Sequence, residues 1–136
     1  MTAPRVGILV NPIAGVGGRV GLAGSDGAEI VAEALARGAI PRANDLAVGA
    51  LEEFRAKWAA ARPTPVLLAA PGDMGVGAAR RAGFAPLVVW TIGEGPTTAA
   101  DTCRLAGDLI AAGIDLLLVA GGDGTARDIC SVVAAL

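Results

Sequence analysis

Four short apolar runs recur along this chain, and a segment with helical spacing follows each of them. The runs carry almost no charge, which is typical of strands that helices cover on both faces. Parallel strands need long crossover connections, and these are usually helices. The alternation therefore predicts an α/β domain with three layers, α/β/α, around a mainly parallel sheet. The expected strands are Arg5–Val10, Pro65–Ala70, Pro86–Trp90 and Asp115–Ala120.

Five segments between and after these runs have helical patterns. Thr98 and Asp101 have the spacing of a capping box, so a helix is expected to begin at Thr98, and Gly113 lies where it should end. Asp73 follows a Pro-Gly pair and is interpreted as the N-cap of the third helix. The expected helices are Ala28–Arg37, Ala50–Arg62, Asp73–Ala82, Thr98–Ala112 and Thr125–Leu136.

Composition indicates one compact domain over residues 1–136, with 54% hydrophobic and 18% charged residues. Aromatic residues are only 3%, so Ala, Val, Leu and Ile must build the core. The sequence contains no histidine, which excludes His-based catalytic triads and His-ligated metal sites. Carboxylates remain the candidate bases near neutral pH, and no metal-ligating residues are predicted.

The net charge and the two ends of the sequence indicate which kinds of partner to expect. The net charge is −2 and the basic residues are scattered, which argues against a nucleic-acid partner. The N-terminal apolar run is too short to cross a membrane, so a cytoplasmic protein with no membrane partner is expected. The chain ends on the apolar pattern "SVVAAL", which predicts an N-terminal domain of a larger protein. An uncovered apolar face would favour self-association, so a homo-oligomer is expected.

A glycine-rich loop, "NPIAGVGGRVGLAGSDG" from Asn11 to Gly27, follows the first strand. Gly15, Gly17 and Gly18 allow its amides to approach an anion closely. The spacing is neither a clean dinucleotide fingerprint nor a Walker A motif, so a purely structural turn stays possible. The loop has 17 residues, whereas such loops usually have about 2–6, and this length favours a functional role.

A second glycine-rich turn, "AGGDGTARD", follows the last strand. Gly121 and Gly122 end the strand, and Gly124 and Thr125 begin a helix. Spacing alone leaves two interpretations equal: Asp123 or Thr125 is a plain N-cap, or Asp123 is a catalytic base. A helix N-terminus favours phosphate oxygens, and a carboxylate beside it could accept a proton from a hydroxyl that attacks a phosphoryl group.

These motifs resemble those of the superfamily of NAD kinases and diacylglycerol- and sphingosine-type lipid kinases. The resemblance rests on "GGDGT" at 121–125 and "NPIAGVGG" at 11–18. With "TTAADT" and "GGDGTARD" it is closest to the ATP-NAD kinase-like branch that includes acetoin-catabolism protein X. It covers nearly the whole chain and implies a Rossmann-like fold of the NAD kinase N-terminal type.

The resemblance also implies roles for single residues. Asp123 would contact the adenosine ribose of NAD and act as the base for its 2′-hydroxyl. Gly121, Gly122, Gly124 and Thr125 would line the nucleotide phosphates. Asn11 and the loop that contains Gly15, Gly17 and Gly18 would face the same cleft, which a second, β-rich domain covers in the family.

The leading hypothesis is a kinase that transfers a phosphoryl group from ATP·Mg²⁺ to NAD, with small-molecule nucleotides as its partners. The 136-residue chain alone is expected to have little or no activity, because half of the cleft would be absent. A lipid kinase and a non-catalytic module that senses NAD(P) or ATP are the alternatives. One departure from typical NAD kinases is "ARD" after GGDGT, where Arg127 is expected either to pair with Asp128 or a neighbouring acid or to reach a phosphate.

Overall fold

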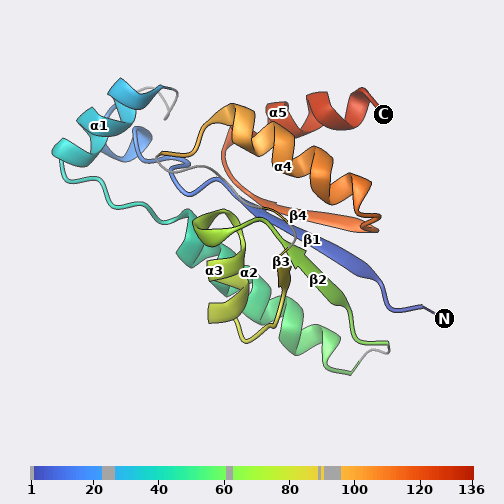
Figure 1. Cartoon of the computed structure of the whole chain (residues 1–136). Coiled ribbons are helices and arrows are strands. Elements are labelled where there is room, and N and C mark those ends of the chain that lie inside the picture. Colours follow the sequence, from blue (N-terminus) through green and yellow to red (C-terminus); the bar gives the residue numbers. More distant parts are fainter. Residues whose placement is uncertain (1, 23–26, 61–62, 89, 91–95) are drawn as a thin grey trace.

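The computed structural model of the chain describes residues 2–22, 27–60, 63–88, 90 and 96–136 (Figure 1). The four strands are β1 Arg5–Val10, β2 Val66–Ala69, β3 Leu87–Val88 and β4 Leu116–Ala120. The helices are α1 Ala28–Ala36, α2 Ala43–Trp58, α3 Val76–Arg81, α4 Ala99–Ala111 and α5 Asp123–Ala134, with short 3-10 turns at Gly18–Val20 and Gly72–Met74.

All pairings in the sheet are parallel, and the strand order is β3-β2-β1-β4. β1 is central and pairs with β2 on one side and with β4 on the other. Val10 at the end of β1 lies opposite Ala120 at the end of β4, so both strands finish at the same edge of the sheet. The expected three-layer α/β/α fold with a parallel sheet is confirmed.

Side chains of β1 alternate between two cores, as the pleat of a strand requires. Val6, Ile8 and Val10 pack in the core formed with α2 and α3, whereas Leu9 packs in the core with α4 and α5. Figure 1 shows α2 and α3 on one face of the sheet and α4 and α5 on the other. The three layers are therefore held together by apolar residues that point in opposite directions from one strand.

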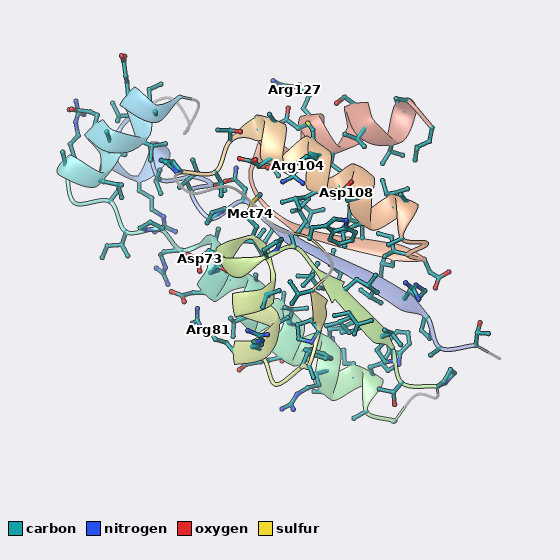
Figure 2. The ribbon with its side chains drawn as sticks, viewed as in Figure 1. Asp73, Met74, Arg81, Arg104, Asp108 and Arg127 are labelled. Carbon is teal, nitrogen blue, oxygen red and sulfur yellow. The ribbon has the colours of Figure 1, made fainter. Side chains whose placement is uncertain are left out.

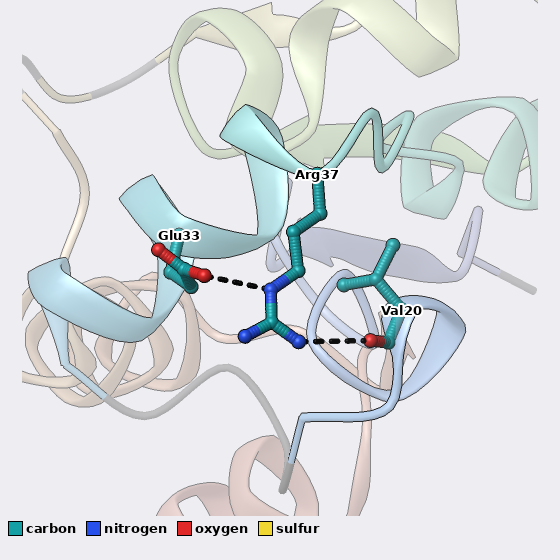
Figure 3. A network of polar contacts seen from close by, with 3 residues as sticks. All are labelled: Val20, Glu33 and Arg37. Carbon is teal, nitrogen blue, oxygen red and sulfur yellow. Dashed lines mark hydrogen bonds and ion pairs between the residues drawn. The ribbon is translucent and has the colours of Figure 1, made fainter.

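α1 and the first glycine-rich loop form a small satellite cluster beside the main body (Figure 1). Val16, Ala34 and Ala39 are its buried members. Arg37 supports it, because its Nε lies 2.7 Å from Glu33 Oε1 and its Nη1 donates to the Val20 carbonyl at 3.4 Å (Figure 3). Most of the apolar residues of the loop that the structure describes thus pack against α1, whereas Ala14 packs against the core of the sheet.

The structure confirms the strands and three of the helices closely, but α2 begins at Ala43 rather than at Ala50. The buried positions of α2 are Ala43, Ala47 and Leu51, which follow an i, i+4, i+8 pattern. The prediction rested on the larger side chains that come later. Two alanines give a weak hydrophobic signal in a sequence, although they suit a helix that packs closely on a sheet.

Asp73 is not the N-cap of α3, so that prediction is wrong. Asp73 lies inside the 3-10 turn Gly72–Met74, and the N-cap of α3 is Gly75. The extra turn separates the Pro-Gly pair from the helix, and the Asp73 carbonyl instead accepts a hydrogen bond from Asn44 Nδ2 at 3.0 Å. Position 89 of the expected third strand and positions 61–62 of the expected second helix lie outside the described residues.

Among the helices of the described part of the chain, none is both long enough and apolar enough to cross a membrane. At the open edge of the sheet, Leu116 and Val119 of β4 are exposed. The expectations of a cytoplasmic homo-oligomer and of a single domain over residues 1–136 stay predictions.

Gly75 should tolerate no side chain, because a Cβ there would lie 2.6 Å from the Ile8 carbonyl oxygen and 3.1 Å from the Ala70 nitrogen. These atoms belong to the backbone of the central strands and their ends, so they cannot move aside. Gly75→Ala is expected to lower the free energy of unfolding by about 1–3 kcal/mol in urea denaturation.

Gly49→Ala is the matched control, because Gly49 lies in the middle of α2 with nothing within 4 Å of an added Cβ. Higher helix propensity should raise the free energy of unfolding by about 0.5–1 kcal/mol. Equal effects of the two substitutions would contradict the packing described for Gly75.

Candidate functional site

The sheet reverses its strand order between β1 and β4. The chain passes from β1 to β2 and β3 on one side and then returns to place β4 on the other side of β1. In open α/β sheets, ligands bind beyond the carboxyl ends of the strands at such a switch point. The two glycine-rich segments begin at this point, since one follows Val10 and the other follows Ala120. Two segments far apart in sequence therefore meet where the topology favours a ligand.

Asn11 joins the two segments through two hydrogen bonds and makes a third within its own loop. Its backbone N–H donates to the Ala120 carbonyl at 2.8 Å, and its Nδ2 donates to Thr125 Oγ1 at 2.9 Å. Its Oδ1 accepts from the Ile13 N–H at 3.2 Å, which shapes the first turn of the loop. Asn11 thus contacts the end of β4, the first turn of α5 and its own loop.

Thr125 is buried, with 5% of its surface exposed, and it packs directly on Gly121. A Cβ at Gly121 would lie 2.5 Å from Thr125 Cβ and Cγ2 and 2.6 Å from its Oγ1. Gly121 is therefore required by the threonine side chain. Gly122 is different, because an added Cβ there would meet nothing within 4 Å.

Neither Asp123 nor Thr125 is the N-cap of α5. The helix begins at Asp123, and its N-cap is Gly122, which has no side chain to accept a hydrogen bond. The first helical bond runs from Ala126 N–H to the Gly122 carbonyl, so within the described residues the N–H groups of Asp123, Gly124 and Thr125 have no acceptor. These three unpaired donors and the positive helix end make such a terminus a ready anion site.

Asp123 is exposed at the first position of α5. None of the hydrogen bonds or ion pairs between described residues uses its carboxylate. A negative charge at this position stabilises a helix by about 0.3–1 kcal/mol, which is the structural alternative to catalysis. The geometry leaves both oxygens free to accept a proton.

Only part of the first glycine-rich loop needs glycine for its backbone angles. Gly15 has a φ of 75° and is exposed, with open space around an added Cβ. Gly17 has a φ of −66° and is buried, and Gly18 is exposed at the start of the 3-10 turn. Gly15 and Gly18 are therefore open to an approaching ligand, whereas Gly17 is not.

A shallow hollow of about 240 Å³ lies beside the second glycine-rich turn, and it is mostly apolar. Ala126 and Cys130 line it from α5 together with Gly122, at helical spacing. Cys103 and Cys130 are both free thiols, and Cys130 is exposed. The i, i+4 spacing from Gly122 was the signal in the sequence that could have placed Ala126 and Cys130 beside the site.

Arg127, which follows the GGDGT motif, forms no ion pair with Asp128 among the described residues. Arg127 is exposed on α5 (Figure 2), and the ion pairs between described residues do not include it. The alternative in which Arg127 pairs with Asp128 or a neighbouring acid is therefore not observed among the described residues, since consecutive helical residues point in different directions. The alternative in which Arg127 reaches a phosphate stays a prediction. On α4, by contrast, Arg104 pairs with Asp108 one turn away, at 3.4 Å.

A parallel sheet with two glycine-rich segments at its switch point, one of them opening an uncapped helix, defines an α/β domain of the nucleotide-binding class. The chain matches the family model of the ATP-NAD kinase N-terminal domain over residues 6–136, and it belongs to that family. No curated protein and no solved structure matches it.

Membership of this family makes the chain part of a kinase, a transferase of phosphoryl groups. The match extends over both glycine-rich segments and all four strands. The assignment to the branch of acetoin-catabolism protein X stays a prediction.

Gly121→Ala should disturb the site from within, because its methyl group would displace the Thr125 side chain and break the hydrogen bond from Asn11. We expect the free energy of unfolding to fall by about 1–3 kcal/mol, as overpacking and a lost buried hydrogen bond both destabilise. Urea denaturation monitored by circular dichroism measures this. Wild-type stability in Gly121→Ala would show that Thr125 is not held as described.

Proposed function

We propose that this domain serves the transfer of the γ-phosphoryl group of ATP·Mg²⁺ to the adenosine 2′-hydroxyl of NAD. Family membership supports kinase chemistry, and the observation that carries the proposal is the open N-terminus of α5. There, Gly122 leaves three backbone N–H groups without acceptors, and the exposed carboxylate of Asp123 stands beside them. Donors for phosphate oxygens and an acceptor for a hydroxyl proton are the two groups that such a reaction needs.

In this proposal the backbone holds the phosphates. The N–H groups of Asp123, Gly124 and Thr125, together with the helix dipole, stabilise negative charge without any basic side chain. Gly122 allows close approach because, apart from its own chain neighbours, no atom of the described residues lies within 4 Å of a Cβ built there. Gly15 and Gly18 of the other loop, both exposed, provide further open backbone on the β1 side. Mg²⁺ enters as the complex with ATP, where it neutralises phosphate charge.

Asp123 acts as the general base in this mechanism. As the 2′-hydroxyl oxygen attacks the γ-phosphorus, its proton passes to the carboxylate and ADP leaves. Such proton transfer contributes about 10²–10⁴-fold to a rate. The carboxylate is suited to it because it is exposed and has no hydrogen-bond partner among the described residues.

Asp123→Asn tests this role in the protein at its full natural length. We expect NADP formation from NAD and ATP to fall by about 10²-fold or more, because the amide cannot accept the proton. The fold should be unchanged, since the carboxylate makes no contact that the amide would lose.

Asp45→Asn is the matched control, because Asp45 is also an exposed aspartate in the first turn of a helix, α2, and its one ion pair among the described residues is with Arg81 at 2.7 Å. It should keep wild-type turnover. Near wild-type NADP formation by Asp123→Asn would exclude Asp123 as the base. Nucleotide binding without turnover in the wild-type protein would favour a sensor, and phosphorylation of diacylglycerol instead of NAD would favour a lipid kinase.

Gly122→Ala tests the phosphate site without touching Asp123. The backbone angles of Gly122, φ −95° and ψ −169°, are open to alanine, and its Cβ would meet no protein atom, so stability should be nearly unchanged. The methyl group should block phosphate approach and weaken ATP binding about tenfold or more in calorimetric titration. Unaltered affinity would place the phosphates elsewhere.

A further inference from the structure

Two glycine-rich segments meet at the candidate site, yet few contacts fix one against the other. Among the described residues, the hydrogen bonds between residues 11–22 and residues 120–125 are two, and both come from Asn11. One is the backbone bond to Ala120, which continues the ladder of β1 and β4. The other, from Asn11 Nδ2 to Thr125 Oγ1, joins side chains 114 positions apart in the sequence.

We propose that Asn11 and Thr125 are a positioning pair that sets the distance between the two segments, rather than two independent ligands of the phosphates. This inference rests on the proposed function and changes the roles that the resemblance implied for both residues. The site would then depend on one interloop hydrogen bond, while the open backbone and Asp123 contact the nucleotide.

The surroundings of Thr125 support this role. Its side chain is buried between Asn11 and the Cα of Gly121, so its position is determined on two sides. Thr125 belongs to the first turn of α5, the turn that carries the unpaired N–H groups. The hydrogen bond from Asn11 to this hydroxyl therefore holds the turn that carries these donors and Asp123.

Asn11 also holds the start of the first glycine-rich loop. Its Oδ1 accepts the Ile13 N–H, and its backbone carbonyl accepts the Ala14 N–H at 3.2 Å. One side chain thus shapes the first turn of the loop with one end and holds α5 with the other. Glycine-rich loops lose much conformational entropy on ordering, so a fixed anchor at their start matters for binding.

The first test measures amide hydrogen exchange by NMR in the 136-residue chain and needs no nucleotide. Thr125→Val keeps the shape of the side chain but removes the hydroxyl, and Thr125→Ser keeps the hydroxyl. We expect Thr125→Val to speed exchange of the Ile13 and Ala14 amides about tenfold, the size of a lost buried hydrogen bond, and Thr125→Ser to leave it near wild type.

Thr102→Val is the control, because Thr102 is a second buried threonine in a helix, with its hydroxyl 3.5 Å from the Thr98 carbonyl. It should leave exchange at Ile13 and Ala14 unchanged. Unchanged exchange at these amides in Thr125→Val, or an equal increase in Thr102→Val, would overturn the proposal.

The second test is a double-mutant cycle on ATP affinity with the protein at its full natural length. Thr125→Val should weaken binding about tenfold and Asn11→Ala at least as much, because Asn11→Ala also removes the acceptor of the Ile13 N–H. The double variant should be no weaker than Asn11→Ala alone, because that substitution already removes the shared bond. A product of the two effects, about 100-fold, would mean that each residue contacts the nucleotide independently. If the wild-type protein binds neither ATP nor NAD, the proposed function fails, whereas the exchange experiment still decides the positioning role.

Discussion

The parallel pairing of β1 with β4 is the contact on which the rest of this structure depends. β1 lies at the centre of the sheet, and its side chains, such as the fully buried Leu9, fill both cores. Because β4 joins β1 on the side away from β2, the strand order reverses at this pair. The pairing brings the end of β1 beside the turn at Gly121, although these segments lie at opposite ends of the sequence. A site formed by both loops exists only when this pair forms.

The helices α4 and α5 begin in opposite ways, and α5 shares its lack of a side-chain cap with α1, α2 and α3. α4 has a complete capping box, in which Thr98 and Asp101 satisfy each other's backbone N–H groups. α5 has Gly122 at the N-cap and leaves its first donors open. A side-chain cap is worth about 1 kcal/mol, so the open end forgoes stability that the neighbouring helix has.

Apolar runs and capping signals predicted most of the fold. The strands, α1 and α4 follow from patterns of large apolar residues and from Thr98 with Asp101. Two predictions failed for physical reasons. The first buried positions of α2 are alanines, and the sequence does not show whether an alanine is buried or exposed. Asp73 is predicted as the N-cap of α3, but a 3-10 turn lies between the Pro-Gly pair and that helix. The place of the second glycine-rich turn between a strand and a helix was predicted from the sequence. The identity of the N-cap of α5, Gly122, was not.

The sequence by itself determined the layers of the fold and the two glycine-rich segments, because hydrophobic periodicity and glycine content are local properties. It left the role of Asp123 open between cap and base. Only the tertiary structure showed that Gly122 is the N-cap, that Thr125 is buried on Gly121, and that Asn11 bonds to Thr125. The bond from Asn11 to Thr125 joins residues more than 100 positions apart, which the pairing of β1 with β4 brings together and no local pattern encodes.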